Sequence, residues 1–108
     1  MIVNELNKEF VSLTSLNGSS SISSMFIGDL LSHVLANANE GDILITVQSN
    51  VNTLAVAALI NLSAIIFPDN IGVSKEVIER AQKEKIPLFR TNLNAKEIVL
   101  LLSRLGVE

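Results

Sequence analysis

The sequence predicts a three-layer α/β/α domain with a mainly parallel sheet. Short apolar segments rich in β-branched residues alternate with segments of helical period, and the connections between them are short. Two of the apolar segments, 43–47 and 64–67, are apolar at nearly every position. Strands of this kind are typical of parallel sheets whose two faces are both covered, and their crossovers are right-handed.

The first 24 residues are expected to form a helix, a strand and a loop. Apolar residues spaced four apart indicate a helix over 2–10, and an apolar–polar alternation indicates a short strand over 11–13. The Ser- and Gly-rich segment 17–24 has little to bury, which predicts a surface loop. Its hydroxyls could be modified or bind an anion, although a plain flexible loop accounts for them more simply.

The middle of the chain reads as strand and helix in turn. Asp29 stands at the N-cap position of a helix that should end near Glu40, because Gly41 readily adopts the left-handed C-cap conformation. Asn50 or Asn52 can cap the next helix, which continues through 55–62. Strands are expected over 25–27, 43–47 and 64–67, the last of which stops at Pro68.

The last third of the sequence predicts two further helices with a strand between them. Ser74 is a good N-cap for a helix with one apolar and one charged face. A short strand follows at 88–89. Asn94 and Glu97 have the spacing of a capping box, which opens a final helix that Gly106 closes.

Length and composition limit the classes of function. A chain of 108 residues has the size of one domain, expected to span 1–108. With 48% apolar residues, a net charge of -3 and no basic stripe, it is expected to fold and not to bind nucleic acid. No segment reads as an export signal or a membrane span, and no cysteine is present. The cytoplasm is therefore the expected compartment.

The inventory of reactive residues argues against catalysis. His33 is the one histidine, and without cysteine the chain cannot build a His/Cys zinc site or a Cys–His pair. Neither of the standard phosphate-binding glycine motifs is present. Asp29, Asp42 and Asp69 stand near element ends, where capping and turn formation account for them. Paired catalytic carboxylates or a Mg²⁺ site are the minority interpretation, because nothing in the spacing groups these residues. We expect no catalytic residue, no metal site and no cofactor.

Three polar segments are candidates for binding a small polar ligand. Each follows a predicted strand and precedes a helix, and ligands of open parallel sheets bind at that edge. Capping and turn formation account for the same residues, so both interpretations stay open. The candidates are Gly28 and Asp29, then Gln48, Ser49 and Asn50, then Thr91, Asn92 and Asn94.

The final helix is a candidate interface. Its apolar residues extend farther round the helix than one buried stripe requires, and soluble oligomers are mostly symmetric. Homodimerisation is therefore the leading hypothesis for any exposed part, and coverage by the domain itself is the alternative. The candidate interface residues are Val99, Leu100 and Leu102, together with His33 at the edge of its helix.

Three stretches cover nearly the whole chain after residue 20. They are FIGDLLSHVLANANEGDILITVQ, NTLAVAALINLSAII and KEVIERAQKEKIPLFRTNLNAKEIVLLLSRLG. Together they resemble the DRTGG-domain family. The resemblance implies a fold like the N-terminal domain of HPr kinase/phosphorylase. It also implies an accessory role in regulation and dimer contacts, because members occur beside CBS domains in regulatory pyrophosphatases and within phosphotransacetylases.

The chain departs from the family at the motif that gives the family its name. Ser19 and Ser20 stand where the acidic and basic residues would be, and Ser24 replaces a glycine. Any contact that depends on that charged pair is in doubt. His33 also stands where relatives often have an aromatic residue.

These observations predict a non-catalytic regulatory or protein-interaction module. It is expected to be a homodimer that acts with a separately encoded enzyme. The alternative is a sensor of a nucleotide or phosphorylated metabolite. A kinase or phosphatase is the weakest interpretation, because the resemblance concerns an accessory domain that lacks the phosphate-binding loop.

Overall fold

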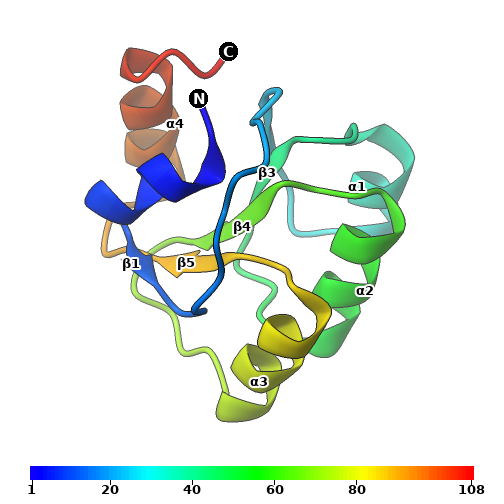
Figure 1. Ribbon diagram of the computed structural model, residues 1–108. Coiled ribbons are helices and arrows are strands. Elements are labelled where there is room, and N and C mark those ends of the chain that lie inside the picture. The colour runs from blue at the N-terminus through cyan, green and yellow to red at the C-terminus, as the bar shows by residue number, and fades with distance from the viewer.

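The computed structural model describes all 108 residues and is built on one five-stranded sheet (Figure 1). The strand order is β1-β5-β4-β3-β2, with β2 to β5 parallel and β1 antiparallel to β5. The predicted mainly parallel sheet is confirmed. The strands are β1 (Val11–Ser12), β2 (Met25–Ile27), β3 (Ile43–Ile45), β4 (Ala64–Phe67) and β5 (Leu88–Arg90).

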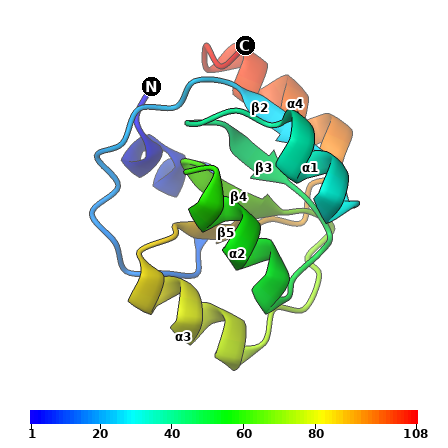
Figure 2. The ribbon, with the colours of Figure 1, turned by 90° about the vertical axis from the view of Figure 1, so that its right-hand side faces the viewer.

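Helices cover both faces of the sheet, so the predicted three layers are confirmed. The chain moves one strand along the sheet at each of the crossovers from β2 to β5, which places α1, α2 and α3 together on one face (Figure 2). The other face carries α4 and a 3-10 helix, η1 (Figure 1). These elements are η1 (Val3–Lys8), α1 (Leu31–Asn37), α2 (Val51–Leu59), α3 (Lys75–Glu84) and α4 (Ala95–Arg104).

The two central strands are sealed on both sides. Every residue of β3 and β4 has 0% of its surface exposed. Ile43 and Ile45 pack on the α4 side and Leu44 on the α2 side, as the alternation of side chains along a strand requires. Burial on both faces therefore explains why these two strands are apolar at nearly every position, as the sequence predicted.

The helix that follows β2 is shorter than predicted. It ends at Asn37, and a tight turn over 39–42 takes the place of its expected last residues. The backbone N–H of Asn39 donates to Asp42 Oδ2 at 2.9 Å, and the N–H of Asp42 donates to the Asn39 carbonyl at 3.1 Å. Gly41 does have the left-handed conformation, with φ of 85°, but it serves this turn and not the helix C-cap.

Three predicted caps are confirmed. The side chain of Asn50 accepts from the Asn52 N–H, Ser74 accepts from Val77, and Asn94 forms a complete capping box with Glu97. Since the cap fixes where a helix starts, α2 begins at Val51, directly after the predicted cap Asn50, and it ends at Leu59, before the expected end at 62. The predicted helix at 2–10 is the 3-10 helix η1.

Segment 17–24 is a loop, as predicted, and backbone hydrogen bonds hold it against neighbouring segments. Asn4 N–H donates to the Gly18 carbonyl at 2.8 Å, and Ser23 N–H donates to the Gly41 carbonyl at 2.9 Å. A Cβ on Gly41 would collide with Ser23 Oγ, so the loop and the 39–42 turn approach as closely as glycine permits. The loop is thus part of the packed molecule.

The outer helix α4 buries most of its apolar surface in its own domain. Ile98 and Leu102 are 0% exposed, Val99 and Leu101 are partly buried against the same core, and Leu100 is 51% exposed. The prediction that Leu102 contacts a second copy is wrong, because this side chain faces the sheet. Leu100 keeps a free surface.

Substitutions on α4 should separate core from surface. We expect Leu102→Ala to lower the free energy of unfolding by ~2–5 kcal/mol, because it opens a cavity beneath the helix. Leu100→Ala, on the exposed side of the same helix, should change it by under ~1 kcal/mol. Chemical denaturation followed by circular dichroism measures both, and equal losses would contradict this assignment of the helix faces.

Candidate functional site

The carboxyl edge of the parallel strands carries the predicted polar residues, and Asp29 organises part of it. Asp29 Oδ1 accepts from Thr46 Oγ1 at 3.0 Å and from the backbone N–H of Val47 at 2.9 Å. Thr46 Oγ1 in turn accepts from the Gln48 N–H at 3.1 Å. Asp29 therefore joins the segment after β2 to the segment after β3.

The prediction that Asp29 caps α1 is wrong. Leu30 occupies the N-cap position and makes no side-chain capping bond. The Asp29 carboxylate instead accepts a charge-assisted hydrogen bond from the Val47 N–H, which lies just after the neighbouring strand β3.

The second predicted segment is occupied by local hydrogen bonds. Asn50 caps α2, and its Nδ2 donates to Gln48 Oε1 at 3.3 Å. Ser49 Oγ donates to the Gly72 carbonyl at 3.0 Å. Neither this segment nor Gly28 and Asp29 lines any hollow of the structure.

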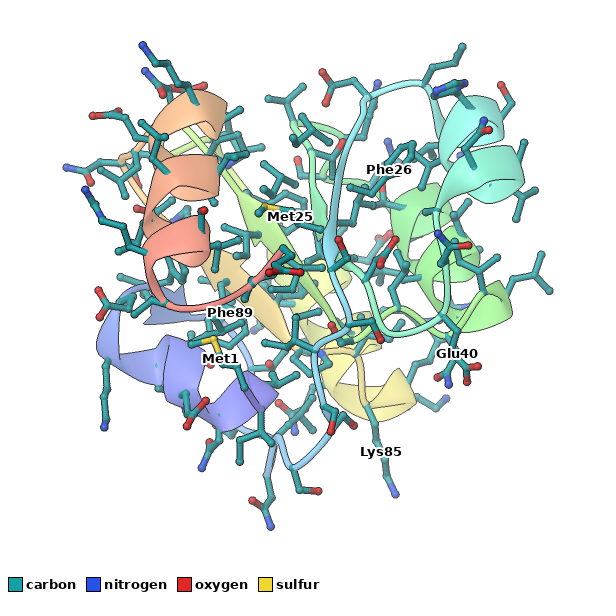
Figure 3. All side chains as sticks on the ribbon, turned by 90° about the horizontal axis from the view of Figure 1, so that it is seen from above. Met1, Met25, Phe26, Glu40, Lys85 and Phe89 are labelled. Atoms are coloured by element: carbon teal, nitrogen blue, oxygen red, sulfur yellow. The ribbon has the colours of Figure 1, made fainter.

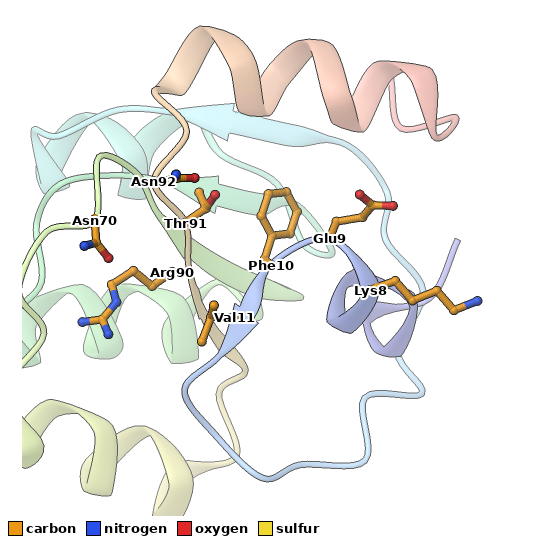
Figure 4. A pocket seen from close by; sticks show the side chains of 8 residues that line it. All are labelled: Lys8, Glu9, Phe10, Val11, Asn70, Arg90, Thr91 and Asn92. Carbon is orange, nitrogen blue, oxygen red and sulfur yellow. The ribbon is translucent and has the colours of Figure 1, made fainter.

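The third predicted segment lies apart from the other two, beside β1. Thr91 is buried and its Oγ1 accepts from the Leu93 N–H at 3.2 Å, while Asn94 is engaged in the cap of α4. Thr91 and Asn92 border a hollow of about 460 Å³, which we call the Arg90 hollow (Figure 4). Its lining comprises Lys8, Glu9, Phe10, Val11, Asn70, Arg90, Thr91 and Asn92.

Arg90 is a candidate ligand-binding group that the sequence analysis missed. It ends β5, points toward Asn70 in Figure 4, and forms no ion pair, since both ion pairs of the chain lie on α3. Asn70 has a left-handed backbone with φ of 50°. The rule that ligands bind where parallel strands end, applied to the residues after β4, would have found Asn70.

No group of three His, Cys, Asp or Glu side chains could hold a metal ion. His33 is exposed, its ring centroid is 5.8 Å from that of Phe26, and its Nδ1 lies 3.1 Å from Asn37 Nδ2. His33 on α1 and Leu100 on α4 lie on opposite faces of the sheet, and their joint role in an interface stays a prediction. The structure contains no helix with the length and hydrophobicity needed to cross a membrane.

A comparison with known protein families shows which family has this fold. The family model of the DRTGG domain matches residues 1–105. The chain belongs to the DRTGG domain family. None of the curated proteins matches it.

A solved structure shares the DRTGG fold. It contains the CBS and DRTGG domains of the regulatory region of Clostridium perfringens pyrophosphatase, in complex with the activator diadenosine tetraphosphate. The alignment has a TM-score of 0.64 and 20% sequence identity, and it covers 87% of this chain. The chain spans 42% of the length of that structure.

Removing the Asp29 carboxylate tests its role at this edge. We expect Asp29→Ala to lower the free energy of unfolding by ~1–3 kcal/mol, because the Thr46 hydroxyl and the Val47 N–H lose their acceptor. Asp29→Asn keeps one acceptor oxygen and should lose less. Urea denaturation compares the two variants. An unchanged free energy of unfolding for Asp29→Ala would contradict the role of Asp29 in joining the segments after β2 and β3.

Proposed function

We propose that this DRTGG domain is a non-catalytic regulatory module of 108 residues that forms a homodimer and acts with a separately encoded cytoplasmic enzyme. Family membership supports a regulatory role, since the structurally similar domain is part of the regulatory region of a pyrophosphatase. The single exposed histidine and the absence of cysteine fit a domain without its own chemistry.

The observation that carries the dimer is an apolar patch beside an open strand. Ile27, Leu30 and Val47 are 52%, 69% and 44% exposed, and we call them the β2 patch. The bond from the Val47 N–H to Asp29 keeps Val47 next to the other two. Clustered exposed apolar side chains are typical of interaction surfaces.

A second copy of the chain fits this patch. β2 is the last strand of the sheet, so one edge of its backbone has no strand partner (Figure 2). Two copies related by a two-fold axis would pair their β2 strands antiparallel and join two sheets into one. The same axis would place the two β2 patches side by side.

Light scattering over a range of concentrations measures the oligomeric state. We expect twice the mass of one chain, and we expect Leu30→Glu to raise the dissociation constant at least ~10-fold, because the interface would then bury a carboxylate. Leu59→Glu is the matched control, since Leu59 is 73% exposed at the far end of α2. A monomer at all concentrations, or equal effects of both variants, would contradict the proposal.

A small-ligand sensor is the second candidate, and the Arg90 hollow favours it. A guanidinium without a carboxylate partner, beside the amides of Asn70 and Asn92, suits a carboxylate or phosphate group. The predicted ligand residues Thr91 and Asn92 belong to this hollow. The other predicted ligand residues would only stabilise the carboxyl edge of the sheet. They are Gly28, Asp29, Gln48, Ser49, Asn50 and Asn94.

A thermal-shift screen with nucleotides and phosphorylated metabolites tests the sensor. A specific ligand at 100 times its dissociation constant should stabilise the fold by about 2.7 kcal/mol. Arg90→Ala should abolish that shift, whereas Arg104→Ala, on the exposed end of α4, should preserve it. Stabilisation that survives Arg90→Ala would place the ligand elsewhere.

A further inference from the structure

His33 extends the β2 patch along helix α1. It stands three residues after Leu30 and four residues before Asn37, so these three side chains lie on one side of the helix. All three residues are exposed. The centroid of the His33 ring is 5.8 Å from that of Phe26. Because Phe26 belongs to the last strand of the sheet, this side of α1 borders the open edge of β2.

The strand β2 gives the His33 ring its support. Side chains alternate along the strand, so Phe26 packs on the α1 side of the sheet and Met25 packs on the α4 side (Figure 3). The His33 ring is therefore held at the border between α1 and the edge strand.

The contacts of Asn37 show that the His33 ring is neutral in this structure. Asn37 Nδ2 donates to the His33 carbonyl at 2.9 Å and lies 3.1 Å from His33 Nδ1. Only the amide nitrogen of Asn37 can donate to a carbonyl, so the nitrogen end of this side chain also faces the ring. His33 Nδ1 is then the acceptor, which requires the ring without its second proton.

The elements around His33 contain no other titratable side chain. Asp, Glu, Lys and Arg are absent from β2, α1, β3 and α2. The charged residues of the connecting segments are Asp29, Glu40 and Asp42, and each accepts a hydrogen bond from its own chain. A proton on His33 would therefore place the one charge on this side of α1.

The dimer proposed above brings this side of α1 against its own copy. When two β2 strands pair about a two-fold axis perpendicular to the sheet, equivalent helices stay on the same face of the joined sheet. The α1 helices of the two copies then lie side by side. The sides that meet are those with Leu30, His33 and Asn37, so His33 faces the partner's His33.

We propose that the paired α1 helices make the dimer sensitive to pH through His33, an inference that rests on the β2 dimer of the proposed function. Histidine changes its charge between about pH 5 and pH 8. Neutral rings can pack against each other, whereas two imidazolium ions would repel each other across the axis. The dimer binds fewer protons than two separate chains, so its dissociation constant rises as the pH falls.

Light scattering of the untagged protein at about pH 7.5 and about pH 5.5 tests this sensitivity, because His33 is the one histidine of the chain. We expect the dissociation constant to be at least ~10-fold higher at the lower pH. His33→Gln removes the titrating ring, so its dissociation constant should be the same at both pH values. The double variant His33→Gln/Ser103→His is the matched control. It carries its histidine on α4, and its dissociation constant should also not depend on pH.

The outcomes separate the role of His33 from the dimer itself. A monomer at both pH values would overturn both proposals. A dimer with one dissociation constant at both pH values, or an equal pH effect in His33→Gln, would overturn the role of His33 alone.

Nuclear magnetic resonance of the wild type gives a second test that needs no variant. At protein concentrations above the dissociation constant, the His33 ring should take up its proton at a lower pH than at concentrations below it. Equal titration midpoints in the dimer and the monomer would overturn the proposal.

Discussion

The burial of β3 and β4 on both faces is the constraint on which the rest of the structure depends. Two strands with no exposed residue need a helical layer above and below, and a parallel order needs a crossover between each pair. The crossovers supply α1, α2 and α3, and the opposite face is left to η1 and α4. Polar groups close to the sheet are thereby limited to the two edges where strands meet loops, while charged residues also lie on the outer face of α3. The Arg90 hollow lies at such an edge.

Much of this architecture was predictable, because it follows from local signals. The runs at 43–47 and 64–67 predicted the central strands, and Ser74 and Asn94 predicted the starts of two helices through bonds within one turn. The wide apolar surface of α4 was harder to interpret. From sequence alone its residues fitted either the core or a second copy, and only the depth of the surrounding layer decided that Leu102 belongs to the core.

The site was less predictable, because it depends on pairs that are distant in sequence. Asp29 has the position and residue type of an N-cap, yet its partners are Thr46 and Val47, which directly follow the next strand. Similarly, the Arg90 hollow is lined by residues from η1, from β1 and from the segments after β4 and at the end of β5. No spacing in the sequence indicates that these residues come together.

Both ends of the chain are fastened to the same short segment. The Ile22 N–H donates to the Met1 carbonyl, and Ser24 Oγ donates to the carbonyl of Glu108 (Figure 1). The segment 22–24 therefore holds the first and the last residue of the chain close to β2, which begins at Met25. Removal of residues from either end would cost this segment one of its hydrogen bonds without touching the buried strands.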